Sequence, residues 1–204
     1  MSVFLDGEYA FGVARIVAAW LSIGQVLTEQ KIQELQQSDV EEIAYQKALH
    51  LLSYRPRSEQ EIRKKLSAAD LADPVIDVVL ERLRTAGLVS DPRFAREWVE
   101  NRNTFRPRGR RLMALELKQK GVAEDVIQDA LATSEDEELL AYQAAIRHAR
   151  KWTGLEWGVF RDRLSAFLGR RGFTYGTIKP VVRQVWVELH SDESSQTLEE
   201  KENE

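Results

Sequence analysis

The stretch YRPRSEQEIRKKLSAADLADPVIDVVL, residues 54–80, is matched 51 residues later by FRPRGRRLMALELKQKGVAEDVIQDAL, residues 105–131. Both copies contain Arg-Pro-Arg near their start, and a further shift of 51 residues aligns a third copy. Five sets of apolar positions share this register: Ile62, Met113 and Leu164; Leu66, Leu117 and Leu168; Leu71, Val122 and Phe173; Ile76, Ile127 and Ile178; Leu80, Leu131 and Val182. Gly121 and Gly172 also align as helix terminators, with Asp70 in the first copy. The register therefore predicts three tandem three-helix units.

Start signals place the individual helices of these units. Capping sequences at 38–41, 58–61 and 134–137 predict three helix starts. Asp73-Pro74 and Asp91-Pro92 each set a cap residue before a proline at the first helical position, which predicts two more.

The remaining helices are predicted from the spacing of apolar residues and from the positions of helix-breaking glycine and proline. Gly87 closes the helix that starts at Asp73. Further helices are expected near 109–120, 123–132, 156–171 and 175–189. Pro180 departs from the repeat pattern, and a start of the last helix near Thr177 would place it in the first turn.

The first twelve residues have the pattern of a β-hairpin, unlike the helical sequence that follows. Val3-Phe4-Leu5 and Glu8-Tyr9-Ala10-Phe11 flank Asp6-Gly7, a pair typical of a hairpin turn. The apolar segment at residues 13–27 indicates a short helix and a turn. Because an isolated hairpin is only marginally stable in water, we expect this segment to cap the helical body.

These signals together predict a mainly α fold of three tandem three-helix repeats that form an elongated, curved rod, with a short N-terminal β-hairpin and helix. The expected divisions are an N-terminal hairpin and helix cap at 1–37, repeat 1 at 38–90, repeat 2 at 91–133, repeat 3 at 134–190 and an acidic disordered tail at 191–204.

Composition narrows the class of protein. The chain has 204 residues, of which 43% are hydrophobic, so global disorder is excluded. It has no cysteine, which removes disulfides, thiol catalysis and thiolate metal sites. No apolar run reaches the roughly 18–20 residues of a membrane span, and the N-terminus lacks the features of a secretory signal. We expect a cytoplasmic protein without membrane contact.

The net charge of −4 conceals a strong segregation. Residues 1–43 and residues 191–204 each carry a net charge of −5, whereas residues 102–120 hold seven bases and a single acid, Glu116. These bases are Arg102, Arg106, Arg108, Arg110, Arg111, Lys118 and Lys120. A cationic middle between acidic ends indicates a polyanionic partner, although a solvated helical face is the simpler alternative.

Catalytic and cofactor signatures are weak. His50, His148 and His190 lie far apart without acidic or histidine partners at ligand spacing, so we expect neither a metal site nor a catalytic residue. Phosphate-loop and dinucleotide fingerprints are missing, and no cofactor is expected. The run Gly169-Arg170-Arg171-Gly172 resembles a GxxG nucleic-acid clamp, but the repeat register favours Gly172 as a helix terminator.

The aromatic residues allow two interpretations. Trp98, Trp152 and Trp186 occupy apolar helical positions and are more typical of a core than of base-stacking platforms. Phe105 lies in a short basic connection and is the best candidate for an exposed aromatic beside a cationic patch, with burial left open.

Several motifs of the chain resemble the RecX family of recombinase regulators. The resemblance rests on Ala48 to Ser58 with Glu61-Ile62, on Leu83 to Asp91, on Arg106 to Leu112 with Glu116 to Val122, and on the N-terminal Phe4 to Gly12. It implies a non-enzymatic modulator of RecA built from three three-helix repeats, acting in DNA recombination, DNA repair and the SOS response. Such proteins bind along the groove of the RecA–single-stranded DNA filament and restrain strand exchange, ATP hydrolysis and co-protease activity.

The expected partners are therefore the RecA filament and single-stranded DNA, bound directly or through the filament, with the protein acting as a monomer. The candidate contact residues are Arg55, Arg57, Arg106, Arg108, Arg110, Arg111, Lys118, Lys120, Arg170 and Arg171. Two alternatives remain: a stand-alone helix-turn-helix-like DNA-binding module, with Gly87-Leu88 as its turn, and a helical scaffold without nucleic-acid contact. The overall acidity counts against the first, and the basic patch counts against the second.

Overall fold

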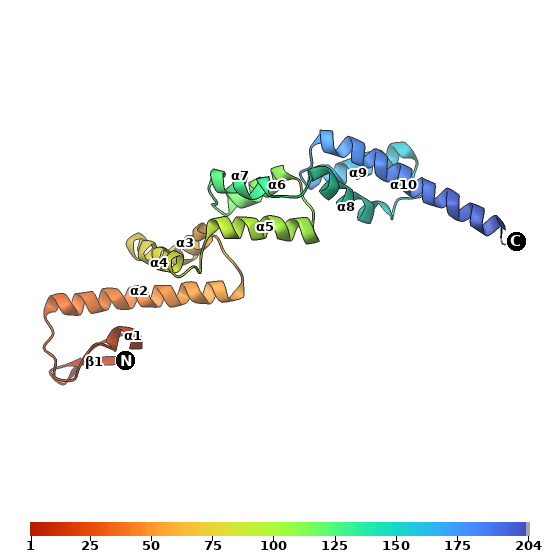
Figure 1. Ribbon diagram of the computed structural model, residues 1–204. Helices are drawn as coiled ribbons and strands as arrows, with labels where there is room; N and C mark the ends of the chain where they lie inside the picture. The colour runs from red at the N-terminus through yellow and green to blue at the C-terminus, as the bar shows by residue number, and fades with distance from the viewer. Residues whose placement is uncertain (203–204) are drawn as a thin grey trace. The chain divides into compact units, whose positions relative to one another are not determined.

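A computed structural model describes the backbone of residues 1–202 and the side chains of residues 1–190. Within that part of the chain there are ten helices and one two-stranded sheet, which confirms the mainly α fold with an N-terminal hairpin (Figure 1). Two compact units, Met1–Phe94 and Ala95–Glu204, divide the chain. None of the described helices combines the length and the apolar character that crossing a membrane requires.

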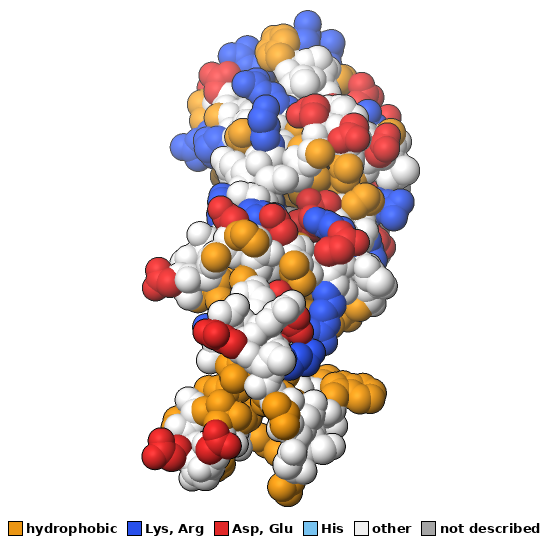
Figure 2. Space-filling view, turned by 90° about the vertical axis from the view of Figure 1, so that its left-hand side faces the viewer, with side chains coloured by type: hydrophobic (Ala, Val, Ile, Leu, Met, Phe, Trp, Pro, Cys, Tyr) orange, Lys and Arg blue, Asp and Glu red, His pale blue; other side chains and the backbone are white. Residues whose placement is uncertain are grey.

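The N-terminal hairpin forms as predicted. Strands β1 (Ser2–Leu5) and β2 (Glu8–Gly12) pair antiparallel, and the two turn residues Asp6 and Gly7 have φ values of 54° and 90°. Both values are positive, as the favoured two-residue hairpin turn requires. Helix α1 (Arg15–Ala18) follows. Figure 2 shows that exposed apolar side chains gather on this segment, at the lower end of the view.

The first repeat contains helices α2 (Glu29–Tyr54), α3 (Glu59–Ser67) and α4 (Asp73–Thr85). The capping box predicted at 58–61 is present, because the Ser58 hydroxyl accepts the Glu61 N–H and the Glu61 carboxylate accepts the Ser58 N–H. The three helices enclose one core, made of Ala44, Ala48, Ile62, Leu66, Val75, Ile76, Val79, Leu80, Leu83 and Val89.

The helix start predicted at 38–41 is wrong. Helix α2 begins nine residues earlier, where the Thr28 side chain accepts the backbone N–H of Lys31. No glycine or proline interrupts residues 29–37, so the helix extends back to Thr28, and the boundary expected at residue 37 falls inside it. Asp39 instead accepts the backbone N–H of Ala14 and attaches the N-terminal segment to α2.

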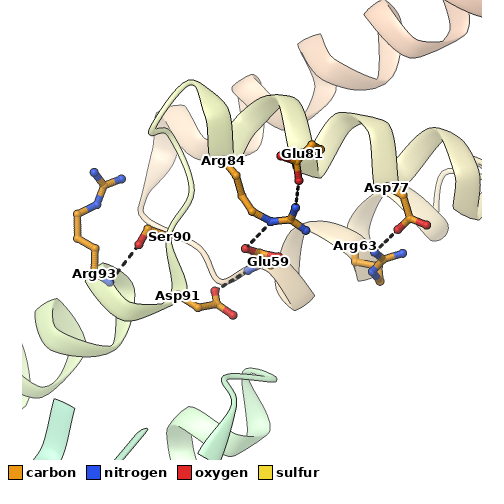
Figure 3. Close-up of polar contacts among 8 residues, drawn as sticks. All are labelled: Glu59, Arg63, Asp77, Glu81, Arg84, Ser90, Asp91 and Arg93. Carbon is orange, nitrogen blue, oxygen red and sulfur yellow. Dashed lines mark hydrogen bonds and ion pairs between the residues drawn. The ribbon is translucent and has the colours of Figure 1, made fainter. Parts of the chain in front are cut away.

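Asp91 caps a different helix from the one predicted. Its Oδ1 accepts the backbone N–H of Glu59, at 2.9 Å, at the start of α3 (Figure 3). Helix α5 (Asp91–Phe105) begins at Asp91 itself, and the Ser90 hydroxyl accepts the N–H of Arg93. Arg84 joins the same cluster by donating to Glu59 at 2.9 Å and pairing with Glu81.

The second and third repeats supply the remaining helices. These are α6 (Arg110–Gln119), α7 (Glu124–Ala132), α8 (Glu137–Ala149), α9 (Trp157–Arg170) and α10 (Tyr175–Glu202). Helices α8, α9 and α10 pack together around a core that includes Leu140, Phe160, Leu164, Leu168 and Val185.

The 51-residue register is confirmed at the helix ends. Asp70, Gly121 and Gly172 have φ values of 58°, 78° and 86°, so each repeat ends its second helix in the left-handed region. In each repeat the next residue donates its N–H five residues back, as in a Schellman motif: Leu71 to Leu66, Val122 to Leu117 and Phe173 to Leu168. Of the fifteen aligned apolar positions, all are buried except Leu71, which is half-buried.

Two other predicted caps are displaced by one or two residues. The N-cap of α4 is Ala72, so Asp73 is the first helical residue. Asp136 caps α8 in place of Ser134, because its carboxylate accepts the N–H groups of Glu138 and Leu139.

Helix α10 begins at Tyr175, as the range 175–189 predicted and not near Thr177, so Pro180 lies in its second turn. Pro180 lacks the N–H that would donate to the carbonyl of Gly176, and its ring crowds the same carbonyl, so the helix tolerates both costs close to its start. The backbone of α10 reaches Glu202. The acidic disordered tail was predicted at 191–204. The side chains of residues 191–202 and all of residues 203 and 204 lie outside the described residues.

Candidate nucleic-acid interface

Four of the predicted contact residues surround one cavity in the second unit. This arginine cavity, of about 630 Å³, is lined by Arg106, Arg108, Leu112, Arg170 and Arg171. Arg106 and Arg108 come from the connection between α5 and α6, and Arg170 and Arg171 come from the end of α9. The fold thus joins cations of the second and third repeats that are about sixty residues apart in sequence.

Backbone contacts hold the two segments together. The N–H of Gly109 donates to the carbonyl of Arg171 at 2.9 Å, and the Arg171 guanidinium donates to the carbonyl of Pro107 at 3.1 Å. A Cβ on Gly109 would overlap the carbonyl of Gly172 and lie 2.6 Å from the nitrogen of Phe173. Close approach of two backbones therefore requires glycine at position 109.

Gly172 has two structural roles. It ends α9 with a positive φ, as the register predicted, and a Cβ at this position would also overlap Leu112 and lie 3.0 Å from its nitrogen. Gly169 has nothing within 4 Å of its Cβ position. The Gly169–Gly172 run is thus a helix terminator docked against the second repeat.

The cations of the cavity repel one another. Burial lowers the pKa of the Arg108 guanidinium, and the charges of Arg102, Arg171 and Arg106 lower it further. Burial also lowers the pKa of Arg171, followed by the charges of Arg106 and Arg147. The fold holds like charges at close range, and a bound anion would relieve this repulsion.

One acid offsets part of this charge. Glu116 forms an ion pair with Arg108 and accepts hydrogen bonds from Arg102 Nε at 3.0 Å and Trp98 Nε1 at 2.9 Å. Arg106 and Arg170 are exposed, and neither forms an ion pair with any described residue. These two arginines are therefore the cations of the cavity most available to a ligand.

Three of the remaining candidates are exposed but do not line the cavity: Arg110, Arg111 and Lys118. Lys120 is half-buried, and its ammonium lies 4.3 Å from the centre of the Trp98 ring. Arg55 and Arg57 belong to the first unit and make contacts there. Arg55 pairs with Glu61 at 3.0 Å, and Arg57 Nε donates to the carbonyl of Leu51 at 2.9 Å.

The aromatic side chains divide as the sequence suggested. Trp98, Trp152 and Trp186 are half-buried, the last two against the core of the third repeat. Phe105 is 69% exposed and directly precedes Arg106, which settles its open alternative in favour of exposure.

His148, for which the sequence predicts neither a metal-binding nor a catalytic role, lies beside Arg171 of the cavity. Its ring stacks on Phe167 at 3.9 Å, and the guanidinium of Arg171 lies 4.6 Å from the centre of the same Phe167 ring. Burial lowers the pKa of His148, and so do the charges of Lys151, Arg171 and Arg170. No motif joins position 148 to these residues, so only the packing of α8 on α9 could identify it.

Comparison with known proteins identifies the family of this fold. The first three-helix domain of RecX matches residues 44–83, and the second matches residues 90–131. The regulatory protein RecX of Bacillus velezensis is 30% identical over 203 residues, which cover 97% of this chain and 76% of that protein. The chain belongs to the RecX family.

Other RecX proteins agree with this assignment. RecX of Bacillus subtilis is 29% identical over 97% of the chain. A crystal structure of regulatory protein RecX superposes with a TM-score of 0.75 at 29% identity, covering 88% of this chain and 92% of that one. RecX from Lactobacillus salivarius shares the fold, with a TM-score of 0.65 at 23% identity. Membership in a family of regulatory proteins gives the chain a regulatory role and confirms the resemblance noted in its sequence.

Proposed function

We propose that this RecX protein is a non-enzymatic, cytoplasmic regulator that binds the RecA–single-stranded DNA filament. In this role it restrains strand exchange, ATP hydrolysis and co-protease activity. The observation that carries the proposal is the arginine cavity, in which Arg106 and Arg170 are exposed and have no acidic partner among residues 1–190. Guanidinium groups bind phosphate with two parallel hydrogen bonds, so such a cluster suits a nucleic-acid backbone.

The charge distribution supports a partner that contains both protein and DNA. A chain with a net charge of −4 is unlike a typical stand-alone DNA-binding module, which is basic overall. Its cations are concentrated in residues 102–120 and at Arg170 and Arg171, while the first 43 residues are acidic. A filament offers phosphates to the cations and protein surface to the rest.

The test replaces the available cations and leaves the structural ones in place. Arg106→Gln with Arg170→Gln removes two exposed charges, whereas Arg108 and Arg171 are kept because they contact Glu116 and Pro107. Lys64→Gln with Lys65→Gln on α3 is the matched control, since both lysines are exposed and the charge change is equal. ATP hydrolysis by RecA on single-stranded DNA is measured with each variant.

We expect the arginine variant to lose most of its restraint of RecA and the lysine variant to keep it. The salt dependence of filament binding is a second measurement, because each neutralised phosphate releases counterions. Losing two phosphate contacts should reduce the slope of log K against log salt by about 1.4. Equal restraint by both variants would contradict the proposal. Binding to single-stranded DNA that RecA filaments do not strengthen, with no restraint of RecA by the parent protein, would favour the stand-alone DNA-binding module.

A further inference from the structure

The third repeat contains a second candidate site, a groove of about 790 Å³ between α9 and α10. Its lining includes Trp157 and Arg161 from α9 and Tyr175, Lys179 and Arg183 from α10, and we call it the aromatic groove. It shares no lining residue with the arginine cavity. Its volume is within the range of pockets that hold small ligands.

The aromatic side chains of the groove are exposed, and Trp157 packs on further rings of the third repeat. Trp157 is 38% exposed and Tyr175 is 76% exposed. Trp157 contacts Trp186 edge to face at 5.3 Å, and Trp186 in turn packs on Phe160 at 5.0 Å and stacks on His190 at 3.7 Å. A large ring that is held on one side and open on the other is suited to stacking with a flat ligand.

Cations follow the aromatics along both helices. Trp157 and Arg161 are four residues apart on α9, and Tyr175, Lys179 and Arg183 repeat the same spacing on α10. Residues spaced by four lie on one helix face, about 5–6 Å apart. Arg161 pairs with Asp162 at 2.8 Å, whereas Lys179 and Arg183 are exposed and form no ion pair with any described residue. The groove is therefore cationic beside its rings.

We propose that the aromatic groove binds unpaired nucleotides of single-stranded DNA directly, with bases stacked on Trp157 and Tyr175 and phosphates at Lys179 and Arg183. Aromatic platforms beside a row of cations are the physical basis of binding to single strands. A duplex keeps its base faces stacked inside, so an unpaired strand suits the exposed rings better. The inference deepens the proposed function, since the filament would supply the single strand.

The experiment measures binding of a fluorescently labelled oligo(dT) to the full chain by anisotropy, without RecA. Trp157→Leu removes the ring, Trp157→Phe keeps one, and Val159→Ala is a control at another exposed apolar position of α9. Loss of one stacking ring weakens binding by roughly 5- to 150-fold. We expect that loss for Trp157→Leu, partial recovery for Trp157→Phe and no change for the control, with the helical circular dichroism spectrum unchanged.

An abasic oligonucleotide of equal length separates stacking from charge, because it keeps the phosphates and lacks the bases. Trp157→Leu should bind the abasic strand as tightly as the parent protein does. Lys179→Gln with Arg183→Gln should instead weaken the binding of both oligonucleotides. Equal effects of Trp157→Leu on oligo(dT) and on the abasic strand, or no effect on either, would overturn the inference.

The two proposals fail separately. If Trp157→Leu leaves oligo(dT) binding intact while Arg106→Gln with Arg170→Gln abolishes restraint of RecA, the proposed function stands and the aromatic groove is refuted. If the reverse holds, the groove binds DNA and the arginine cavity is not the regulatory contact.

Discussion

Gly109 and Gly172 meet backbone to backbone, and no side chain could be inserted between them. Gly109 is the N-cap of α6, and Gly172 directly follows the C-cap of α9, so this contact joins the second repeat to the third. It also brings Arg106 and Arg108 to the same cavity as Arg170 and Arg171. The geometry of the candidate interface therefore depends on two residues that carry no side chain.

The first prediction concerns this contact. Gly109→Ala should lower the free energy of unfolding by about 1–3 kcal/mol, because the added Cβ meets backbone atoms that cannot rotate away. Gly158→Ala in α9 is the control, since its Cβ would have nothing within 4 Å and alanine favours the helix. Urea unfolding of both variants checks the prediction. A Gly109→Ala protein as stable as the parent would show that the joint between repeats is loosely packed.

The second prediction tests the faces assigned by the 51-residue register. Leu117 is fully buried, so Leu117→Ala should destabilise the protein by roughly 2–5 kcal/mol. Arg110 is exposed on the same helix, and Arg110→Ala should change the stability by less than about 0.5 kcal/mol. Thermal or chemical unfolding measures both. Similar melting behaviour of the two variants would contradict the assignment.

The third prediction concerns pH and His148. Burial and the charges of Lys151, Arg171 and Arg170 lower its pKa below the ordinary value of 6.5. The unfolded chain then binds the proton more tightly, so the contribution of His148 to stability is present above pH 6.5 and is lost as the pH falls below it. An NMR titration of the ring should give a midpoint below 6.5, and a midpoint above that value would contradict the prediction.

The same histidine reports on occupancy of the arginine cavity. A polyanion bound at Arg170 and Arg171 offsets two of the charges that lower the pKa of His148. Adding single-stranded DNA, with or without RecA, should therefore move the titration midpoint upward. An unchanged midpoint at saturating DNA would place the bound strand away from this cavity.

The fourth prediction concerns the shape expected from tandem repeats. A compact globule of 204 residues has a radius of gyration of about 17 Å. Repeats that contact only their neighbours give an extended chain, so small-angle scattering should yield a clearly larger value. A radius near 17 Å would contradict the predicted rod.

The sequence by itself determined the repeat, the helices and the ends of each second helix. Those features depend on neighbours within about five residues: apolar spacing, capping side chains and the tolerance of Gly121 and Gly172 for positive φ. Even Asp70, which is not glycine, could be placed because it occupies the same register position. The start of α2 was harder to predict, because Ser38 and Thr28 can both cap a helix. The structure uses Thr28, since nothing interrupts the helix between the two residues.

Only the tertiary structure decided which cations are available to a ligand. Arg55 and Arg57 are as basic in sequence as Arg106 and Arg108, yet they make contacts with Glu61 and Leu51 within the first unit. Arg108 likewise pairs with an acid, Glu116, whereas Arg106 and Arg170 remain exposed. Charge attraction acts through space, so which cations are paired depends on where the packed helices place each acid, and the long-range Gly109–Gly172 contact is what brings Arg106 and Arg170 to one cavity.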